Sequence, residues 1–374
     1  MAGDDLVSVE PDPDAGELRR AVGVDRREMG EGVRLDQLAR PVGKLHADRI
    51  ADAPLPRKVP LRCPAEGGLR LTSNRDIVTR HLRWFLVLAC AGAVAVTGAA
   101  GAAAADLRPY RGLATWVDIY DTDVWKDPEG AVDDIAARGV RTVYLETSNH
   151  SQRVAILRPK LVGRFVEAAH TYGLAVVAWY LPGFLEPARD VRRSLAAIDF
   201  RTPSGQSFNR FALDIEASAV KSPVLRTKRL LRVAADLRAA VGPTYPLGAI
   251  ILSPRGLELS PTIWPGFPYR GLAARFDVFL PMVYFTYRTR KEGHTRAYVA
   301  SSIAVLRRET GDPSVPIHVI GGIADRARSG QTKGFVDAVC KANVFGASLY
   351  DFATTGAAKW SQLSRIPDCT GGRT

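Results

Sequence analysis

Histidine is scarce in this sequence, and the motifs of three common enzyme classes are missing. Six His residues are scattered over 374 residues with no H-E-x-x-H motif, which argues against a zinc site. There is no G-x-S-x-G turn, so a serine hydrolase is disfavoured. No G-x-G-x-x-G follows the first apolar strand, so the usual signature of a dinucleotide site is absent. We therefore expect no metal and no cofactor.

Acidic residues are outnumbered by basic ones, and the excess lies in the second part of the chain. The formal net charge is +12, and residues 106–374 hold 36 Lys and Arg against 25 Asp and Glu. A basic surface attracts acidic partners such as nucleic acid, anionic lipid or anionic wall polymers. Clusters of Lys and Arg with interleaved aromatic residues are missing, so we expect no nucleic-acid partner.

A sustained apolar period is absent from residues 1–77, which are rich in Pro, Gly, Asp and Arg and are predicted to be disordered. Residues 78–105 contain two arginines, then an uncharged run from Trp84 to Ala105 that ends in small residues. This pattern is typical of a secretory signal peptide cleaved after Ala105, and it predicts a secreted or extracytoplasmic protein. A single membrane anchor is the alternative. Since a signal peptide normally starts a protein, residues 1–77 are either an extension or lie upstream of a true start near Val78.

Cysteine is also rare, and residues 106–374 keep only Cys340 and Cys369. An export signal together with an even number of cysteines favours one disulfide between them. It would tie the C-terminal tail to a predicted helix and contribute on the order of 3 kcal/mol to stability. Two free thiols are the alternative.

Short β-type runs alternate with helical patterns from residue 106 to the C-terminus. The predicted strands are residues 112–120, 140–147, 174–181, 210–217, 246–253, 276–285, 316–323 and 346–353. Strand–helix alternation implies parallel pairing, and eight such units match the length of a (β/α)8 TIM barrel. An open doubly wound sheet is disfavoured, because such a sheet typically has a glycine-rich nucleotide-binding turn after its first strand, and this sequence has none there. We expect residues 106–374 to form one barrel.

Carboxylates and aromatic side chains collect where the predicted strands end. Catalytic groups in such barrels come from the C-terminal ends of the strands. The candidate residues at these positions are Trp116, Asp118, Glu146, Trp179, Tyr180, Asp214, Glu216, Tyr284 and Asp351. Aromatic rings suit the C–H faces of sugars, and carboxylates bind their hydroxyls. This end of the barrel is therefore predicted to bind a polysaccharide.

The stretch "LDIE" carries the strongest chemical signal, because it places two carboxylates in an apolar strand. Asp214 and Glu216 point to the same side, with Glu216 nearer the rim. Burial and mutual repulsion would keep part of this pair protonated near neutral pH, as a general acid requires. A second D-x-E, formed by Asp127 and Glu129, opens a predicted helix, where capping explains it.

At these residues the sequence resembles the glycoside hydrolase barrels related to family 25 lysozymes and family 18 chitinases. In both, the fourth strand carries a D-x-E whose Glu is the catalytic acid, and Asp214 and Glu216 match it. Asp118 matches the Asp that follows the first strand in family 25. Met282 and Tyr284 match the M-x-Y of family 18, whose Tyr assists at the reacting sugar.

The longer family 18 pattern, D-x-x-D-x-D-x-E, is incomplete, because Asn209 and Ala212 stand at its first two acidic positions. The resemblance therefore implies a divergent relative of the same barrel superfamily. It implies an exported enzyme that hydrolyses a cell-wall or extracellular glycan, with Glu216 as general acid and Asp214 as its partner.

Other interpretations stay open from the sequence. The incomplete acidic pattern favours a barrel that binds carbohydrate at the cell wall without cleaving it. Glu146 and Asp351 either face Glu216 or pair with Arg153 and Lys359. Trp116, Trp179 and Tyr180 are either sugar platforms or parts of the core.

Overall fold

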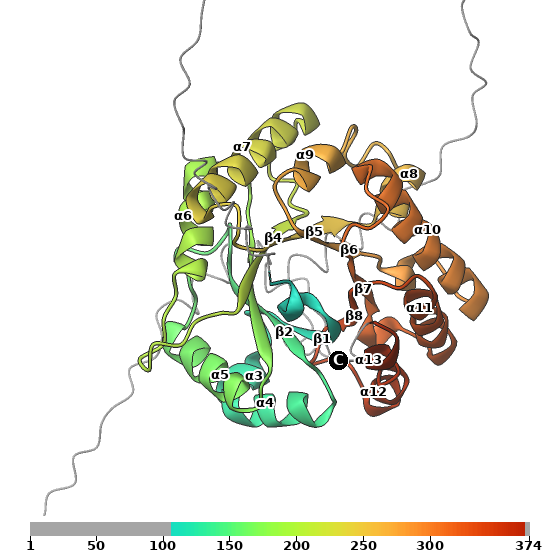
Figure 1. Cartoon of the computed structure of the whole chain (residues 1–374), viewed down its shortest axis with the longest axis horizontal. Helices are drawn as coiled ribbons and strands as arrows, with labels where there is room; N and C mark the ends of the chain where they lie inside the picture. Colours follow the sequence, from blue (N-terminus) through green and yellow to red (C-terminus); the bar gives the residue numbers. More distant parts are fainter. Residues whose placement is uncertain (1–105, 371–374) are drawn as a thin grey trace, which may run out of the picture.

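The fold is a closed barrel of eight parallel strands enclosed by helices (Figure 1). The computed structural model describes residues 106–370. The strands are β1 (Gly112–Val117), β2 (Thr142–Asn149), β3 (Ala175–Leu181), β4 (Arg210–Ile215), β5 (Leu247–Leu252), β6 (Val278–Met282), β7 (His318–Ile323) and β8 (Gly346–Tyr350). Each strand pairs with the next along the chain, and β8 closes the barrel on β1. The predicted barrel is confirmed, and each predicted strand overlaps one observed strand.

Helices follow the strands and form the outer layer in Figure 1. They are α3 (Thr122–Lys126), α4 (Pro128–Ala137), α5 (Pro159–Thr171), α6 (Pro187–Ile198), α7 (Pro223–Val241), α8 (Pro254–Leu259), α9 (Tyr269–Ala273), α10 (Glu292–Thr310), α11 (Ser329–Lys341), α12 (Ala357–Leu363) and α13 (Ile366–Cys369). Several open with proline at the first helical position, where its missing N–H costs nothing.

The D-x-E at the start of α4 has the structural role that the sequence predicts. The Asp127 carboxylate accepts a hydrogen bond from the Gly130 N–H at 3.1 Å and caps the helix. Glu129 makes an ion pair with Arg164 of α5, with 2.6 Å between the charged atoms. This motif lies on the outer layer, away from the barrel interior.

The N-terminal end of the barrel is closed by Tyr110 and His318. Tyr110, in the short 3-10 helix η2 (Arg108–Tyr110), donates its hydroxyl hydrogen to the Phe211 carbonyl at 2.8 Å. The Nδ1 atom of His318 lies 2.9 Å from the Tyr110 carbonyl, and its Nε2 atom lies 3.1 Å from Ser348 Oγ. A carbonyl can only accept, so Nδ1 carries the hydrogen and Nε2 accepts from Ser348. The geometry therefore holds His318 as a neutral imidazole.

We expect His318 to make the barrel sensitive to acid. Burial lowers the pKa of His318 from 6.5 to about 4. The unfolded chain thus takes up this proton at a higher pH than the folded chain, and acid favours unfolding. Between pH 7.5 and pH 4 this one group should remove about 3 kcal/mol of stability.

Urea unfolding of the wild type and of His318→Gln across this pH range measures the effect. Glutamine can still donate to Tyr110 and accept from Ser348, but it does not titrate. The difference in unfolding free energy between the two proteins should therefore shift in favour of the variant as pH falls. A constant difference would contradict the prediction.

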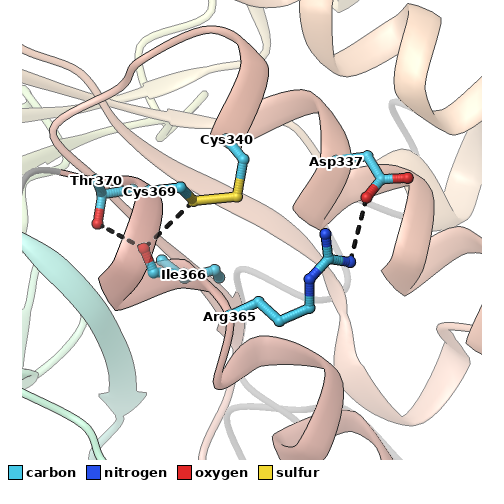
Figure 2. Close-up of a disulfide and its surroundings, with 6 residues drawn as sticks. All are labelled: Asp337, Cys340, Arg365, Ile366, Cys369 and Thr370. Carbon is cyan, nitrogen blue, oxygen red and sulfur yellow. Dashed lines mark hydrogen bonds and ion pairs between the residues drawn. A yellow bond between two sulfur atoms is a disulfide. The ribbon is translucent and has the colours of Figure 1, made fainter.

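The predicted disulfide is confirmed between Cys340 of α11 and Cys369 of α13 (Figure 2). The two Cα atoms lie 5.0 Å apart. Arg365, just before α13, makes an ion pair with Asp337 of α11 at 3.3 Å, so a second contact links the same two segments. The C-terminal tail is thereby fixed against the last long helix.

Removing this disulfide should lower the free energy of unfolding by about 3 kcal/mol, because the bond closes a loop of 29 residues in the unfolded chain. Urea unfolding of the wild type and of the double variant Cys340→Ser/Cys369→Ser would show the difference. A thiol reductant should bring the wild type down to the level of the variant and leave the variant unchanged. If the reductant destabilised both proteins equally, the disulfide would not be the cause of their difference in unfolding free energy.

The expected disordered segment 1–77 and the expected signal peptide or membrane anchor 78–105 lie outside the described residues. Asp106, the first described residue, contacts Arg210 at the start of β4, with 3.2 Å between the charged atoms. The chain therefore joins the barrel at its N-terminal end, opposite the strand ends that carry the acidic residues. Between residues 106 and 370, no helix combines the length and apolar character needed to span a membrane.

Candidate active site

Asp214 and Glu216 lie at the C-terminal end of β4, where the sequence predicts them. Alternation along the strand buries Leu213 and Ile215 completely on the other face. Asp214 is paired in register with Ile250 of β5, and Glu216 is the first residue after the strand. Each of the two acidic residues is only 6% exposed. The strand thus holds two carboxyl groups together at the mouth of the barrel, with little water around them.

Burial controls the protonation of this pair. It raises the pKa of Glu216 to about 8, so this side chain holds its proton at neutral pH. Burial, followed by the charges of Glu216 and Glu146, also raises the pKa of Asp214 well above its usual range. Within the described part of the chain, Asp214 Oδ1 has no hydrogen-bond partner although it is buried. A polar atom in this condition is available to a bound ligand.

Glu146 and Asp118 bring two more carboxyl groups to the same end of the barrel. Glu146 accepts hydrogen bonds from the Ile119 N–H and from the Asn149 amide, each at 3.2 Å. Burial and then the charge of Asp118 raise the pKa of Glu146 well above its usual range. The hydroxyl of Tyr350, at the end of β8, donates to Asp118 Oδ2 at 2.8 Å. These bonds connect the ends of β1, β2 and β8.

Asp351 follows β8 directly and belongs to the same region. Its Oδ1 accepts hydrogen bonds from the Thr354 N–H at 3.0 Å and from the Thr354 hydroxyl at 2.8 Å. The negative charges of Glu216, Asp214 and Asp351 add to burial in raising the pKa of Tyr284. The residues predicted from five different strand ends therefore share one electrostatic environment.

Asp118, Asp121 and Asp351 could in principle share a cation, since among the described residues their carboxylate oxygens lie within 4.8 Å of one another. Hydrogen bonds already explain this arrangement. The Tyr120 N–H donates to Asp118 at 2.7 Å, and the Asp118 N–H donates to Asp121 at 2.9 Å. We interpret the cluster as a brace of the loops after β1 and β8 and assign no metal to it.

Two predicted tryptophans lie inside the barrel, beneath and beside the acidic residues. Trp116 stacks on Tyr144 with 4.3 Å between ring centroids, and its indole N–H donates to Ser348 Oγ at 2.8 Å. It is 2% exposed, which makes it a floor beneath the site. Trp179 lies beside Glu146 in the pairing of β2 with β3. Its buried indole N–H has no hydrogen-bond partner among the described residues, so it can serve a ligand.

Tyr180 is not part of this arrangement. It follows Trp179 in β3 and therefore points to the opposite face of the strand. Its ring is fully buried, and its hydroxyl donates to Asp190 of α6 at 2.8 Å. The expectation that Tyr180 contacts substrate is corrected: it anchors the outer helix layer.

A cavity open to solvent lies beside Glu216, and its empty space, including the solvent at its mouth, is about 470 Å³. It lies between the ends of β4, β5 and β6 and the helical segments α8, η3 (Phe285–Tyr287) and α10. The lining residues are Glu216, Leu252, Ser253, Gly256, Leu257, Ile263, Met282, Tyr284, Tyr287, Arg288 and Tyr298. Apolar and tyrosine side chains form most of this wall. Met282 and Tyr284, which the sequence singles out, both reach it.

The sequence alone did not find Ser253, Tyr287, Arg288 and Tyr298. Ser253 directly follows β5, so the search for polar residues at the C-terminal ends of strands, which found the other candidates, could have found it as well. Tyr287 and Arg288 lie in and after η3, beyond the predicted sixth strand. Tyr298 lies within α10, where a tyrosine gives no signal for a site.

Comparisons with known proteins show a shared barrel. No family model matches the chain, and no curated protein matches it in sequence. The endo-beta-1,4-mannanase from Thermotoga petrophila superposes with a TM-score of 0.55 at 9% identity, over 71% of this chain and 78% of that one. The chitinase catalytic domain from Pyrococcus furiosus gives 0.52 at 13% identity, over 70% and 97%. The spore cortex-lytic enzyme from Bacillus cereus gives 0.50 at 7% identity, over 68% and 74%.

The likeness is one of fold. The expected glycoside hydrolase-like barrel is confirmed at that level, and a chitinase is among the similar structures. The finer resemblance to family 25 lysozymes stays a prediction, as do the roles of the individual side chains.

Proposed function

We propose that this protein is a glycoside hydrolase that cleaves a polysaccharide, with Glu216 as the general acid. One observation carries the proposal: the buried carboxyl group of Glu216 forms part of a tyrosine-lined cavity at the C-terminal end of a (β/α)8 barrel. Catalytic groups in this fold are found at this end of the strands. A pKa of about 8 keeps the proton on Glu216 under neutral conditions, when a general acid must have one to give.

The reaction follows from this placement. Glu216 donates its proton to the glycosidic oxygen while the bond from that oxygen to the anomeric carbon breaks. Water supplies the hydroxyl group that the anomeric carbon gains, and the remaining proton returns to the carboxylate. Asp214, one layer deeper on the same strand, offers its unpartnered Oδ1 to the reacting sugar.

The other residues of the mouth have binding roles in this proposal. Glu146, Asp118 and Asp351 offer carboxyl oxygens for sugar hydroxyls, and Trp179 offers its buried N–H. Tyr284 provides an aromatic face next to Glu216 in the cavity wall. Trp116 supports the site from below.

The names of the similar structures support a polymeric sugar as substrate, since they include a mannanase and a chitinase. Export is part of the same proposal. The pattern of residues 78–105 supports it, and so does the disulfide, because such bonds persist mainly outside the reducing cytosol. A cell-wall or extracellular glycan is the substrate that fits this location.

The test is release of new reducing ends from a panel of purified wall and extracellular polysaccharides by the wild-type protein and by Glu216→Gln. The proposal expects product from at least one polysaccharide with the wild type and almost none with the variant. Saturable binding by both proteins without product would instead support the alternative of a non-catalytic carbohydrate-binding barrel.

A further inference from the structure

Large apolar side chains are exposed at the mouth end of the barrel. Among the described residues, the large hydrophobic side chains that are exposed are Val154, Tyr172, Leu185, Val224 and Leu225. Four of these five come after the C-terminal ends of β2, β3 and β4, either in the loop or in the first turn of the next helix. Tyr172 directly follows α5 and therefore lies at the opposite end of the barrel. Apolar exposure is thus concentrated at the end that carries the proposed active site.

The loop after β3 holds Leu185 outside the core. Its neighbour Phe184 is fully buried and has a φ of 57°, a left-handed conformation that needs support from its surroundings. The Phe184 N–H donates to Asp190 Oδ2 at 2.9 Å. On the other side, Arg229 of α7 donates to the carbonyl groups of Phe184 and Leu185 at 3.0 and 3.1 Å. The loop is fixed by both helices, so the 47% exposure of Leu185 belongs to the folded state.

The same bonds bring Leu185 to the start of α7. Leu225 lies one helical turn before Arg229 and therefore on the same face of α7. Its neighbour Val224 is 81% exposed. The helices α6 and α7 also pack against each other, as Figure 1 shows. Leu185, Val224 and Leu225 thus lie close together on the surface, and we call these three residues the apolar patch.

Basic side chains accompany the apolar patch. Residues 217–235 contain five Lys and Arg and no Asp or Glu. Lys228 lies four residues after Val224 on the same face of α7, Lys221 lies just before the N-cap of this helix, and both are exposed. The first turn of α7 has no acidic residue, although a negative charge there would favour the helix. This surface is therefore apolar and basic at once.

The combination suits an anionic lipid bilayer better than other acidic partners. Apolar side chains can enter the boundary between headgroups and acyl chains, while lysine ammonium groups reach the lipid phosphates. A soluble anionic polymer would be bound by basic residues alone and gains nothing from an exposed valine. Three apolar side chains are also too few for a stable protein interface, which buries about 800 Å² on each partner. Glu186, the acidic neighbour of Leu185, pairs with Arg189 at 2.9 Å, so it does not repel such a surface.

We propose that the barrel docks on an anionic membrane surface, with the apolar patch in the lipid interface and Lys221 and Lys228 on the phosphates. The contact is peripheral, and it turns the mouth of the barrel toward the bilayer. The inference does not rest on the proposed hydrolase, because no residue of the cavity takes part in it. It adds a place of action, since docking brings the cavity close to glycans at the membrane surface.

A fluorescent probe on the patch tests both docking and its direction. In the full chain, with Cys63→Ser and Cys90→Ser, either Val224→Cys or the control Tyr172→Cys is labelled with an environment-sensitive fluorophore. Vesicles of equal parts phosphatidylglycerol and phosphatidylcholine are compared with vesicles of phosphatidylcholine alone. The apolar run from Trp84 to Ala105 precedes the end of the barrel that carries Tyr172, so insertion of that run would not by itself place a probe at position 224 in lipid.

We expect the probe at position 224 to shift its emission to shorter wavelength with the anionic vesicles only. The probe at position 172 should keep the emission that it has in buffer. Leu185→Ser/Leu225→Ser should raise the lipid concentration of the half-maximal shift roughly 10- to 100-fold, because less apolar surface enters the interface.

Lys221→Gln/Lys228→Gln should raise the same lipid concentration roughly 10- to 30-fold, through the lost attraction to anionic headgroups. Arg138→Gln/Lys341→Gln is the matched control, because it removes two exposed charges at the ends of α4 and α11, on the opposite side of the barrel. These charges lie far from a membrane docked at the mouth, and salt screens them, so the control should change the concentration less than about twofold.

Three results would overturn the inference: no shift at position 224, an equal shift at positions 224 and 172, or an equal shift with both kinds of vesicle. Sedimentation with anionic vesicles that leaves the probe at position 224 in water would also refute docking through the apolar patch, because it would show attraction by charge alone. Hydrolysis of soluble polysaccharides is measured without vesicles, so the membrane contact and the proposed hydrolase can each fail while the other stands.

Discussion

Glu216→Gln should lower kcat on the hydrolysed polysaccharide by about 10²- to 10⁴-fold, the usual contribution of a general acid. Glutamine has nearly the same shape as the protonated glutamic acid that it replaces, and the site is already built around a neutral side chain. Substrate binding should therefore survive, and the loss should appear in kcat more than in KM. Initial rates of reducing-end release give both constants.

Glu129→Gln is the matched control, because Glu129 belongs to the second D-x-E and its side chain is 44% exposed. It makes the same Glu-to-Gln replacement on the outside of the barrel, so the rate should stay within twofold of the wild type. A loss of activity in this variant comparable to that of Glu216→Gln would mean that charge or folding, not the position of Glu216, determines the rate.

The pH dependence of the wild type gives a second measurement on the same group. Since the protonated form of Glu216 is the active one and its pKa is raised to about 8, kcat/KM should decline as pH rises through 8. A decline already near pH 4.5, the ordinary value for a glutamic acid, would show that Glu216 does not act as this acid.

Much of this site follows from the sequence, because strand ends are easy to recognise in a barrel with short apolar strands. The D-x-E in the fourth unit identified Asp214 and Glu216. The neighbouring acidic residues were found by the rule that catalytic groups lie at the C-terminal ends of the strands. The rule does not say which face of a strand points inward. Trp179 and Tyr180 were both expected at the mouth, but adjacent strand residues point to opposite faces, so only one of them could reach it.

The arginine in the cavity could not be predicted in the same way. Arg288 lines the same cavity as Glu216 because η3 packs against β7 and α10 and because α10 packs against α8. These are contacts between helices and loops that carry no residue pattern of their own. The hydroxyl of Tyr298, which reaches Arg288 from within α10, depends on the same packing.

Glu216→Gln should also stabilise the fold in mildly alkaline solution, by about 4 kcal/mol at pH 8. The folded protein keeps the proton on Glu216 up to about pH 8, whereas an ordinary glutamic acid loses it at 4.5. As pH rises between these values, the unfolded chain releases the proton first, so the wild type becomes less stable. Glutamine cannot ionise and escapes this loss. At pH 4.5 the two proteins should be nearly equal.

Thermal unfolding of both proteins at pH 4.5 and at pH 8 measures this difference. At pH 8 the Tm of Glu216→Gln should exceed that of the wild type by on the order of 10 °C for a domain of this size. Glu129→Gln should show no gain at either pH, because Glu129 is already paired with Arg164 on the surface. A gain of equal size at both pH values would indicate better packing of the amide, not relief of a buried charge. No gain at pH 8 would mean that Glu216 ionises in the folded protein at an ordinary pH, and a side chain that has lost its proton by then cannot protonate a leaving group under neutral conditions. The stability of an inactive variant thus tests the protonation state on which the proposed catalysis depends.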